Sequence, residues 1–289
     1  MAKWDGKTKG SLSGYKFFVF LINNLGVRFS YFFCIFVAGG YIVFSSKARR
    51  GLTNYYQVGF GLPKGKARRK SFSNFYIFGK TLIDRIAVTG RKRKLYSYDF
   101  NNEKALREMN ELGRGGILYS AHLGNWESAG NLISDRITNK INILMLDAEV
   151  EKIKDFLNET TGGPQYNIIP LKDDLSHLIL IHRALKRGEL IAVHADRVMD
   201  DSNSVELPFL NGKAKFPIGP FILAEKFKVP VTFVYAMKGT KFHYEFYATD
   251  LSTEPKTAHE LAAEYVKSLE NMVRKYPNQW FNFYHYYAS

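Results

Sequence analysis

Hydrophobic positions divide this chain into two regions with different patterns. The first hundred residues hold two long, aromatic-rich apolar runs at residues 15–22 and 29–46, and the second run contains no charged residue. From about residue 100 onward, short apolar runs alternate with longer amphipathic stretches. Short buried runs are typical of strands, and amphipathic stretches are typical of helices. The second region is therefore predicted to alternate between strand and helix.

The predicted strands of the second region are residues 116–121, 141–146, 166–171, 190–194, 231–235 and 244–247. The predicted helices are residues 102–113, 128–133, 151–158 and 173–186, one within 216–228, and 257–275. Alternation of this kind predicts an α/β fold with a mixed, largely parallel central sheet flanked by helices. In such sheets, ligands bind beyond the carboxyl ends of the strands.

The apolar runs before residue 50 allow two interpretations. They could form a pair of core helices that cover the sheet, or a helical element that lies in or dips into a membrane interface. The run at 29–46 is close to the lower limit for crossing a bilayer, which takes about 20 residues, so spanning and lying along the membrane both stay open. Basic clusters at residues 47–50, 64–70 and 91–94 favour the membrane, because each Lys or Arg contributes about 1 kcal/mol at an anionic leaflet. We therefore divide the chain into a membrane-associating apolar segment at 1–50 and an α/β domain at 51–289.

Composition narrows the class of protein further. With 289 residues, of which 46% are hydrophobic and 15% aromatic, the chain is not disordered. The net charge of +14 suits an anionic partner, such as nucleic acid, an anionic membrane surface, an acidic carrier protein or a phosphorylated lipid. The single cysteine, Cys34, allows no disulfide within the chain and indicates a reducing compartment.

A candidate base follows the strand at 116–121. His122 is expected at the carboxyl end of this strand, Asn125 is a suitable N-cap for the next helix, and Glu127 falls in the first turn of that helix. A histidine removes protons near neutral pH, and a nearby carboxylate fixes its tautomer and stabilises the imidazolium. A structural histidine paired with a glutamate at a helix start is the alternative. The chain shows no evident protein nucleophile, since Cys34 lies in an apolar run and no G-x-S-x-G motif occurs.

A second group of polar residues follows the strand at 190–194. Arg197 is a candidate to stabilise an oxyanion or to bind a phosphate, and backbone N–H groups near Gly219 at a helix start could do the same. The alternative for Asp196 and Arg197 is a structural ion pair. His194 with the nearby aspartates does not have the spacing of metal ligands, so we expect no metal.

Motifs along most of the chain resemble those of the lysophospholipid acyltransferase superfamily, and are closest to its lipid A biosynthesis (lauroyl/myristoyl) acyltransferase branch. These motifs are H-L-G-N-W-E at 122–127, D-R at 196–197, F-L-N-G at 209–212, F-P-I-G at 216–219, V-P-V at 229–231 and P-N-Q-W at 277–280. The branch often has basic residues shortly after the last motif, whereas this chain has His285-Tyr286-Tyr287. A headgroup contact carried over to that position is therefore in doubt.

The resemblance implies a membrane-associated O-acyltransferase. Such an enzyme moves a fatty acyl group from an acyl thioester, on acyl carrier protein or less often coenzyme A, to a hydroxyl of a lipid A precursor. The thioester is a co-substrate, and no cofactor is expected. The implied location is the cytoplasmic face of the bacterial inner membrane, where the anionic membrane surface is a further partner.

The resemblance also assigns roles to residues. His122 is the expected general base, Glu127 orients it, and Arg197 with backbone N–H groups near Gly219 stabilises the oxyanion. The expected supporting residues are Asn125, Trp126 and Asp196.

Other functions stay open at this point. The same chemistry could act on a lyso-aminolipid, lysophosphatidic acid, or a polyene or pigment alcohol. A non-catalytic membrane adaptor is a second alternative. A basic nucleic-acid-binding protein is a third, and it is disfavoured because the chain has no recognised nucleic-acid motif, so we expect no nucleic-acid partner.

Overall fold

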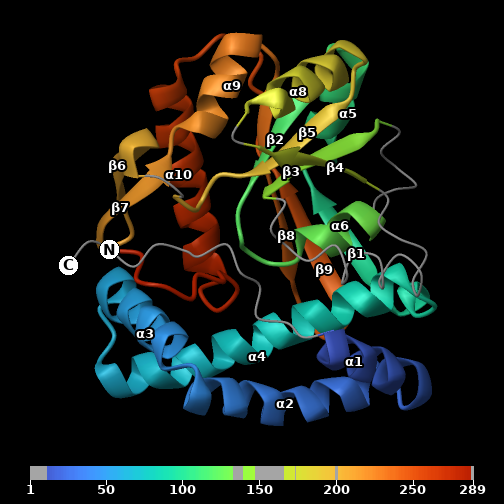
Figure 1. Ribbon diagram of the computed structural model, residues 1–289, viewed down its shortest axis with the longest axis vertical. Helices are drawn as coiled ribbons and strands as arrows, with labels where there is room; N and C mark the ends of the chain where they lie inside the picture. The colour runs from blue at the N-terminus through green and yellow to red at the C-terminus, as the bar shows by residue number, and fades with distance from the viewer. Residues whose placement is uncertain (1–11, 133–138, 147–165, 173, 199–200, 288–289) are drawn as a thin grey trace.

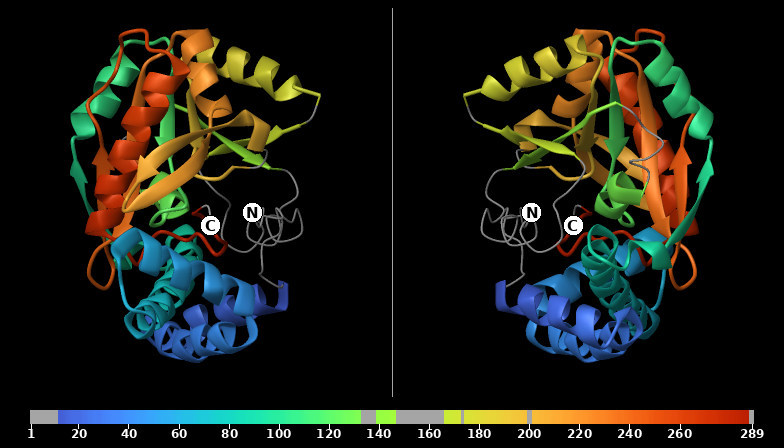
Figure 2. Two further views of the ribbon diagram at one scale, coloured as in Figure 1. Left: turned by 90° about the vertical axis from the view of Figure 1, so that its left-hand side faces the viewer. Right: turned by 90° about the vertical axis from the view of Figure 1, so that its right-hand side faces the viewer.

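The computed structural model describes residues 12–132, 139–146, 166–172, 174–198 and 201–287 of the chain (Figure 1). These residues form a central sheet with helices around it, and a layer of helices beneath the sheet (Figures 1 and 2). The predicted helix at 151–158 lies outside the described residues.

The central sheet has seven strands in the order β1-β9-β8-β2-β5-β3-β4. The strands are β1 (Ser97–Asn101), β2 (Gly116–Ser120), β3 (Ile141–Leu146), β4 (Asn167–Leu171), β5 (Leu190–His194), β8 (Val231–Lys238) and β9 (His243–Ala248). All neighbouring pairs are parallel except β8 with β9. The prediction of a mixed, largely parallel sheet is confirmed.

Two features of the sheet structure were not predicted. β1 is an edge strand that alternates exposed and half-buried residues, so it contains no apolar run. A separate antiparallel hairpin of β6 (Ser204–Phe209) and β7 (Gly212–Pro217) lies in a region where no strand was predicted. β1, β6 and β7 are all short strands with mixed polar and apolar positions.

Helices connect and cover the strands. They are α5 (Glu103–Glu111), α6 (Trp126–Leu132), α8 (Ser176–Lys186), α9 (Gly219–Phe227) and α10 (Ala258–Lys275), with short 3-10 turns at Arg93–Leu95 and Asp201–Asn203. α10 begins at a capping box, in which the Thr257 side chain accepts from the Glu260 N–H and the Glu260 carboxylate accepts from the Thr257 N–H. Its buried stripe includes Tyr265, whose ring packs against Phe233 of β8. α10 is thereby fixed on the middle of the sheet.

The first four helices form the layer beneath the sheet (Figures 1 and 2). They are α1 (Leu12–Asn24), α2 (Val27–Phe44), α3 (Ser46–Phe60) and α4 (Lys64–Thr89). α4 is the long central member, and it contacts α2 on one side and α6 on the other. The helical layer therefore lies at the end of the sheet where α6 begins, which is the carboxyl end of β2.

α2 has two different faces. Its buried residues recur every three or four positions, as Val27, Ser30, Cys34 and Ala38. This stripe faces α4, where a Cβ atom at Gly79 would collide with the Cys34 sulfur. The opposite face exposes large apolar side chains: Phe29, Phe32, Phe36, Val43 and Phe44. α2 is long and apolar enough to cross a membrane by length and composition, yet only 22% of its residues are buried, so it does not serve as a core helix over the sheet.

Candidate active site

The corner between β2 and α6 is fixed by backbone contacts and requires a glycine. Gly124 has a φ of +73°, and a Cβ atom there would collide with the Ala236 carbonyl oxygen. The Gly124 N–H donates to the Gln279 carbonyl oxygen at 2.9 Å, and the Asn125 N–H donates to the Ala236 carbonyl oxygen at 2.7 Å. This corner holds His122 just beyond the end of β2.

His122 contacts the carboxylate of Asp196 at two points. Its Nδ1 lies 2.7 Å from Oδ1, and its backbone N–H donates to Oδ2 at 3.0 Å. The indole Nε1 of Trp280 also donates to Oδ2, at 3.0 Å. β2 and β5 are parallel neighbours in which Ser120 is level with His194, so the residues two positions beyond each strand end meet. Trp280, the last residue of the P-N-Q-W motif, thus provides the third N–H group on the Asp196 carboxylate, after the two of His122.

The charge on Asp196 is stabilised by its neighbours. The side chain is fully buried, while the His122 side chain is 27% exposed. Burial alone raises the pKa of the Asp196 carboxyl, but the charge of His122, the hydrogen bond from it and the charge of Arg197 together lower the pKa below its ordinary value. Asp196 is therefore a carboxylate at physiological pH. The Nδ1–H of His122 is then assigned as the donor to Asp196, which leaves the lone pair of the neutral ring on Nε2.

Glu127 is the second residue of α6, as expected from the motif, and its side chain is not among those described. Its predicted role in orienting His122 stays a prediction. The carboxylate that the structure places on His122 belongs to Asp196, which had been expected only to support the site. This contact follows from the register of the adjacent strands β2 and β5, which brings the residues after them together, and not from the spacing of residues within one motif.

Arg197 belongs to the same corner. Its Nη2 donates to the Phe281 carbonyl oxygen at 2.8 Å, and its Nε donates to the Asn282 side-chain oxygen at 3.2 Å. The Phe281 N–H in turn donates to the His122 carbonyl oxygen at 2.8 Å. The C-terminal segment thus joins the two loops that follow β2 and β5.

An aromatic wall lies beside the His122 ring. The ring of His194 is 4.5 Å from that of His122 and 4.7 Å from that of Trp126, between centroids. Burial, and then the charge of His122, lower the pKa of His194 well below its ordinary value. His194 is therefore neutral near pH 7, and its ring lies between those of His122 and Trp126. Among the described residues, no group of three or more His, Cys, Asp and Glu side chains is placed to hold a metal ion.

A buried ionic network supports the loop from below. The Asn125 side-chain amide donates to the Thr81 carbonyl oxygen at 3.1 Å and to the Tyr244 hydroxyl at 3.0 Å. The Tyr244 hydroxyl donates to Asp84, whose Oδ2 also lies 2.5 Å from the Lys238 Nζ. Sequence reasoning missed Asp84 and Lys238, since nothing local in the chain pairs a residue of α4 with one of β8.

Gly219 begins α9, as predicted. In the first turn of α9, the Pro220 carbonyl oxygen accepts a hydrogen bond from the Tyr119 hydroxyl at 2.9 Å. This bond ties the start of α9 to β2. Its role in anion binding stays a prediction.

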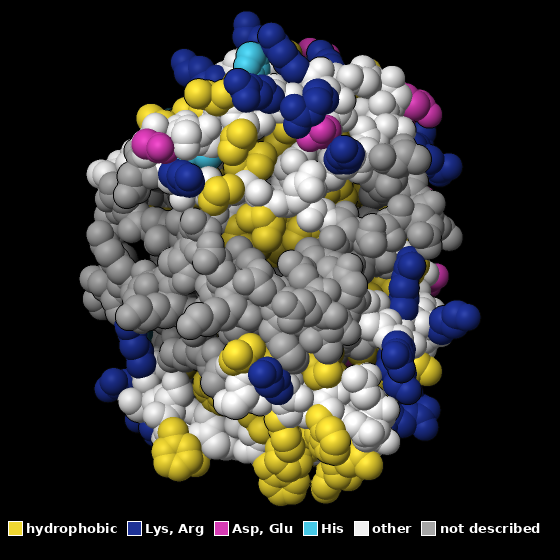
Figure 3. Space-filling model, turned by 45° about the vertical axis from the view of Figure 1, so that its right-hand side comes forward, with side chains coloured by type: hydrophobic (Ala, Val, Ile, Leu, Met, Phe, Trp, Pro, Cys, Tyr) yellow, Lys and Arg dark blue, Asp and Glu magenta, His cyan; other side chains and the backbone are white. Residues whose placement is uncertain are grey.

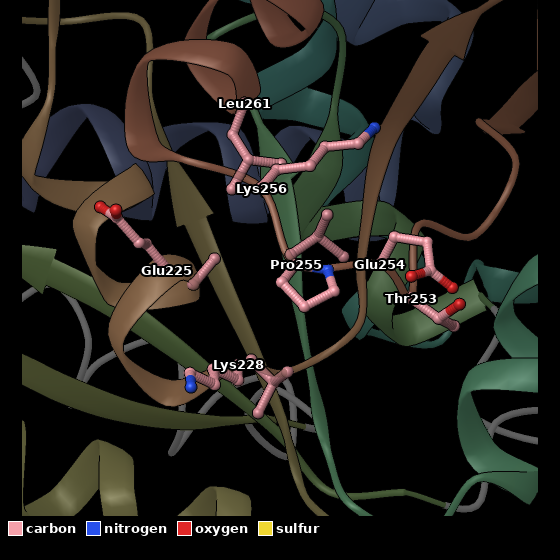
Figure 4. Close-up of a pocket in the computed structure, with 10 residues that line it drawn as sticks. Glu225, Lys228, Thr253, Glu254, Pro255, Lys256 and Leu261 are labelled. Atoms are coloured by element: carbon pink, nitrogen blue, oxygen red, sulfur yellow. The ribbon is translucent and has the colours of Figure 1, made fainter.

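A small pocket lies at the far end of the sheet (Figure 4). It has a volume of about 20 Å³ and is lined by residues at the end of α9, the start of β8 and the start of α10, including Lys228, Val231 and Leu261. Because β8 runs parallel to β2, its first residue lies at the end of the sheet opposite His122. This pocket is not part of the site.

The fold and the site define an α/β protein in which a histidine is held by a buried carboxylate at the carboxyl end of parallel strands. Comparison with protein families identifies its kind: the model for bacterial lipid A biosynthesis acyltransferases matches residues 11–287. The chain belongs to this family and is an acyltransferase. The resemblance seen in the motifs is thereby confirmed. A search of curated proteins found no match.

Proposed function

We propose that this protein transfers a fatty acyl group from an acyl thioester to a hydroxyl of a lipid A precursor, with His122 as general base. The observation that carries the proposal is the 2.7 Å contact between His122 Nδ1 and the buried carboxylate of Asp196. This contact favours the tautomer in which Nε2 accepts a proton. Family membership supplies the reaction class.

The reaction proceeds in two steps. His122 Nε2 takes the proton of the acceptor hydroxyl as its oxygen attacks the thioester carbonyl carbon, and a tetrahedral oxyanion forms. The C–S bond then breaks, and the imidazolium returns its proton to the thiolate leaving group. Asp196 stabilises the imidazolium between these steps without taking the proton itself, as carboxylates do in related base arrangements.

Arg197 is the proposed stabiliser of the oxyanion. Its guanidinium is held by Phe281 and Asn282 and so is already oriented before substrate arrives, which is what makes such a charge effective. Backbone N–H groups near Gly219 are a second proposed source of stabilisation. Trp126 and His194 form the wall against which the substrate packs, and Glu127 is a second candidate for orienting the imidazole.

The surface charge supports the proposed partners. A net charge of +14 attracts an acidic acyl carrier protein, a phosphorylated acceptor lipid and an anionic membrane. Acyl-coenzyme A, which carries phosphates, is the alternative donor. The thioester is a co-substrate, so the proposed chemistry needs no cofactor. We propose no nucleic-acid partner.

The helical layer supports membrane association. α2 is attached to α4 by one face and exposes aromatic side chains on the other, so we propose that it lies along the membrane surface rather than crossing it. Figure 3 shows hydrophobic side chains projecting together from the base of the molecule, with Lys and Arg side chains higher on its flanks. The basic clusters at 47–50, 64–70 and 91–94 all fall within or just after α3 and α4. The proposed location is the cytoplasmic face of the bacterial inner membrane.

Two measurements test the proposed function together. The purified protein is given an acyl thioester and a lipid A precursor in micelles, and the acceptor mass is followed. In parallel, membrane lipids of a deletion strain and its parent are compared by mass spectrometry. The proposal expects the acceptor to gain one acyl chain in vitro, and lipid A of the deletion strain to lack one. Loss of a chain from an aminolipid or pigment ester instead would reassign the acceptor, and no change in either measurement would reject the function.

A further inference from the structure

A hollow lined by basic side chains lies where α3, the start of α4 and the C-terminal segment meet. Its volume is about 380 Å³, which falls in the range of small-molecule binding sites. Its titratable lining residues are Arg49, Arg50, Lys64, Arg68 and His285, and no Asp or Glu is among the residues that line it. We call it the basic hollow, and it is separate from the His122 corner.

The described part of the chain places no carboxylate against the cations of the basic hollow. Among the described residues, no carboxylate lies within ion-pairing distance of Arg50, Lys64 or Arg68. Arg49 is held by its Nη1, which donates to the Ile42 carbonyl oxygen at 2.6 Å. Like charges gathered on one surface repel each other, and a bound anion relieves that repulsion.

The walls of the basic hollow are rigid. A Cβ atom at Gly51 would come within 2.7 Å of the Tyr284 backbone, so α3 packs directly on the C-terminal segment. The hydroxyls of Tyr55 and Tyr56 both donate to the Pro277 carbonyl oxygen, at 3.1 Å. These contacts bring cations from α3 and α4 together with a residue more than 200 positions later in the chain.

The same C-terminal segment reaches the catalytic corner. Phe281 donates to His122 and accepts from Arg197, and His285 follows four residues later. A fully extended chain spans at most about 3.6 Å per residue, so the Cα atoms of Phe281 and His285 lie within about 14 Å of each other. A ligand in the basic hollow is therefore near enough to belong to a substrate that also reaches His122.

We propose that the basic hollow binds a phosphate group of one of the substrates of the proposed acyl transfer. Guanidinium groups bind phosphate by paired hydrogen bonds, and three arginines, Arg49, Arg50 and Arg68, line the hollow. The phosphate could belong to the acceptor glycolipid or to the donor, as the phosphopantetheine linkage of a carrier protein or the phosphates of coenzyme A. The link to His122 through the C-terminal segment favours a substrate over the surface of an anionic membrane.

The first test measures binding without catalysis. The hollow variant, Arg50→Gln/Arg68→Gln, removes two exposed cations whose side chains make no hydrogen bond to the described residues. The α5 variant, Arg107→Gln/Arg114→Gln, removes two exposed cations near α5, at the other end of the molecule. Thermal unfolding is followed while inorganic phosphate replaces chloride at constant ionic strength. Wild type and the α5 variant should gain stability with phosphate, and the hollow variant should bind phosphate at least about tenfold more weakly. Equal stabilisation of all three proteins would overturn the proposal.

The second test identifies the source of the phosphate and rests on the proposed function. Transfer rates are compared for the phosphorylated acceptor and its dephosphorylated form, and for acyl-carrier protein, acyl-coenzyme A and an N-acetylcysteamine thioester that has no phosphate. An acceptor site predicts that the hollow variant raises KM for the phosphorylated acceptor alone, at least about tenfold, with kcat within about twofold. A donor site predicts a raised KM for the two phosphate-bearing donors and not for the N-acetylcysteamine thioester.

The two proposals can fail separately. If wild type transfers no acyl group, the proposed function fails while the phosphate titration still tests the hollow. If the hollow variant loses affinity only for vesicles of anionic lipid, with phosphate binding and every KM unchanged, the hollow is a membrane contact and the proposal is wrong.

Discussion

The Nδ1 atom of His122 lies 2.7 Å from the Asp196 carboxylate, although 74 positions separate the two residues in the chain. β2 and β5 are adjacent and parallel, so each delivers its following loop to the same edge of the sheet. The pairing follows from topology, and it makes Asp196 the group that holds the proposed base.

Asp196 and Glu127 can be compared directly by matched amide substitutions. Asp196→Asn removes the charge that stabilises the imidazolium and disturbs three N–H contacts. We expect kcat for acyl transfer to fall by at least about a hundredfold. Glu127→Gln should lower it less if Asp196 alone orients the ring. Steady-state rates of the two purified variants check this, with circular dichroism to confirm folding. A larger loss in Glu127→Gln would return the orienting role to the motif glutamate.

The buried pair of Lys238 and Asp84 predicts a large stability effect. Lys238→Met leaves Asp84 charged and without its cation in the interior, which costs about 3–5 kcal/mol of unfolding free energy. Urea unfolding measures it. The double variant Asp84→Asn/Lys238→Met should recover part of the loss, because no uncompensated charge remains. Lys104→Met is the control: it removes an exposed partner of Glu108 and should leave the unfolding free energy almost unchanged. A similar loss in both single variants would contradict the account.

His194 predicts a dependence of stability on pH. The pKa of His194 is lowered in the folded protein, so below pH about 6.5 the unfolded chain binds a proton that the folded one does not. Stability is therefore lost as the pH falls from 7 to 5, by up to about 1.4 kcal/mol per pH unit from this residue. Asp196 adds no slope in this window, because its lowered pKa keeps it ionised.

Urea unfolding at pH 7, 6 and 5 measures this effect. His194→Asn should flatten the curve relative to wild type. Parallel curves would show that His194 is not the neutral residue described here.

The exposed face of α2 predicts how membrane association responds to mutation. Phe29→Ser/Phe32→Ser/Phe36→Ser removes three exposed rings, and should weaken binding to vesicles that contain anionic lipid by at least about tenfold. Leu175→Ser/Ile179→Ser/Leu180→Ser is the matched control, since these exposed apolar residues lie at α8, on the far side of the sheet from the helical layer. Co-sedimentation with vesicles measures both. Equal losses, or none, would contradict the proposed orientation.

Sequence patterns predicted most of the sheet because its central strands are buried on both faces. β2, for example, is buried at every position, and a continuous apolar run is the pattern that such a strand requires. β1 was missed because an edge strand needs only one apolar face, and β6 and β7 were missed because their short alternating pattern resembles a polar loop with a turn.

The candidate site was predictable only in part. His122, Asn125 and Arg197 could be found from local motifs, because each lies at the end of a predicted strand or the start of a helix. The contacts that hold them could not be found in this way: Trp280 on Asp196, and Asp84 beneath Asn125, join segments that are distant in sequence. The basic hollow has the same origin, since its cations looked like separate charged clusters along the chain.

The most direct test of the central claim is the acyl-transfer rate of purified His122→Ala with the thioester donor and the lipid A precursor in micelles. The claim that His122 removes the proton of the acceptor hydroxyl predicts a loss of at least about a hundredfold in kcat, in a protein that unfolds at the wild-type temperature within a few degrees. A folded His122→Ala variant that transfers the acyl group at the wild-type rate would contradict it.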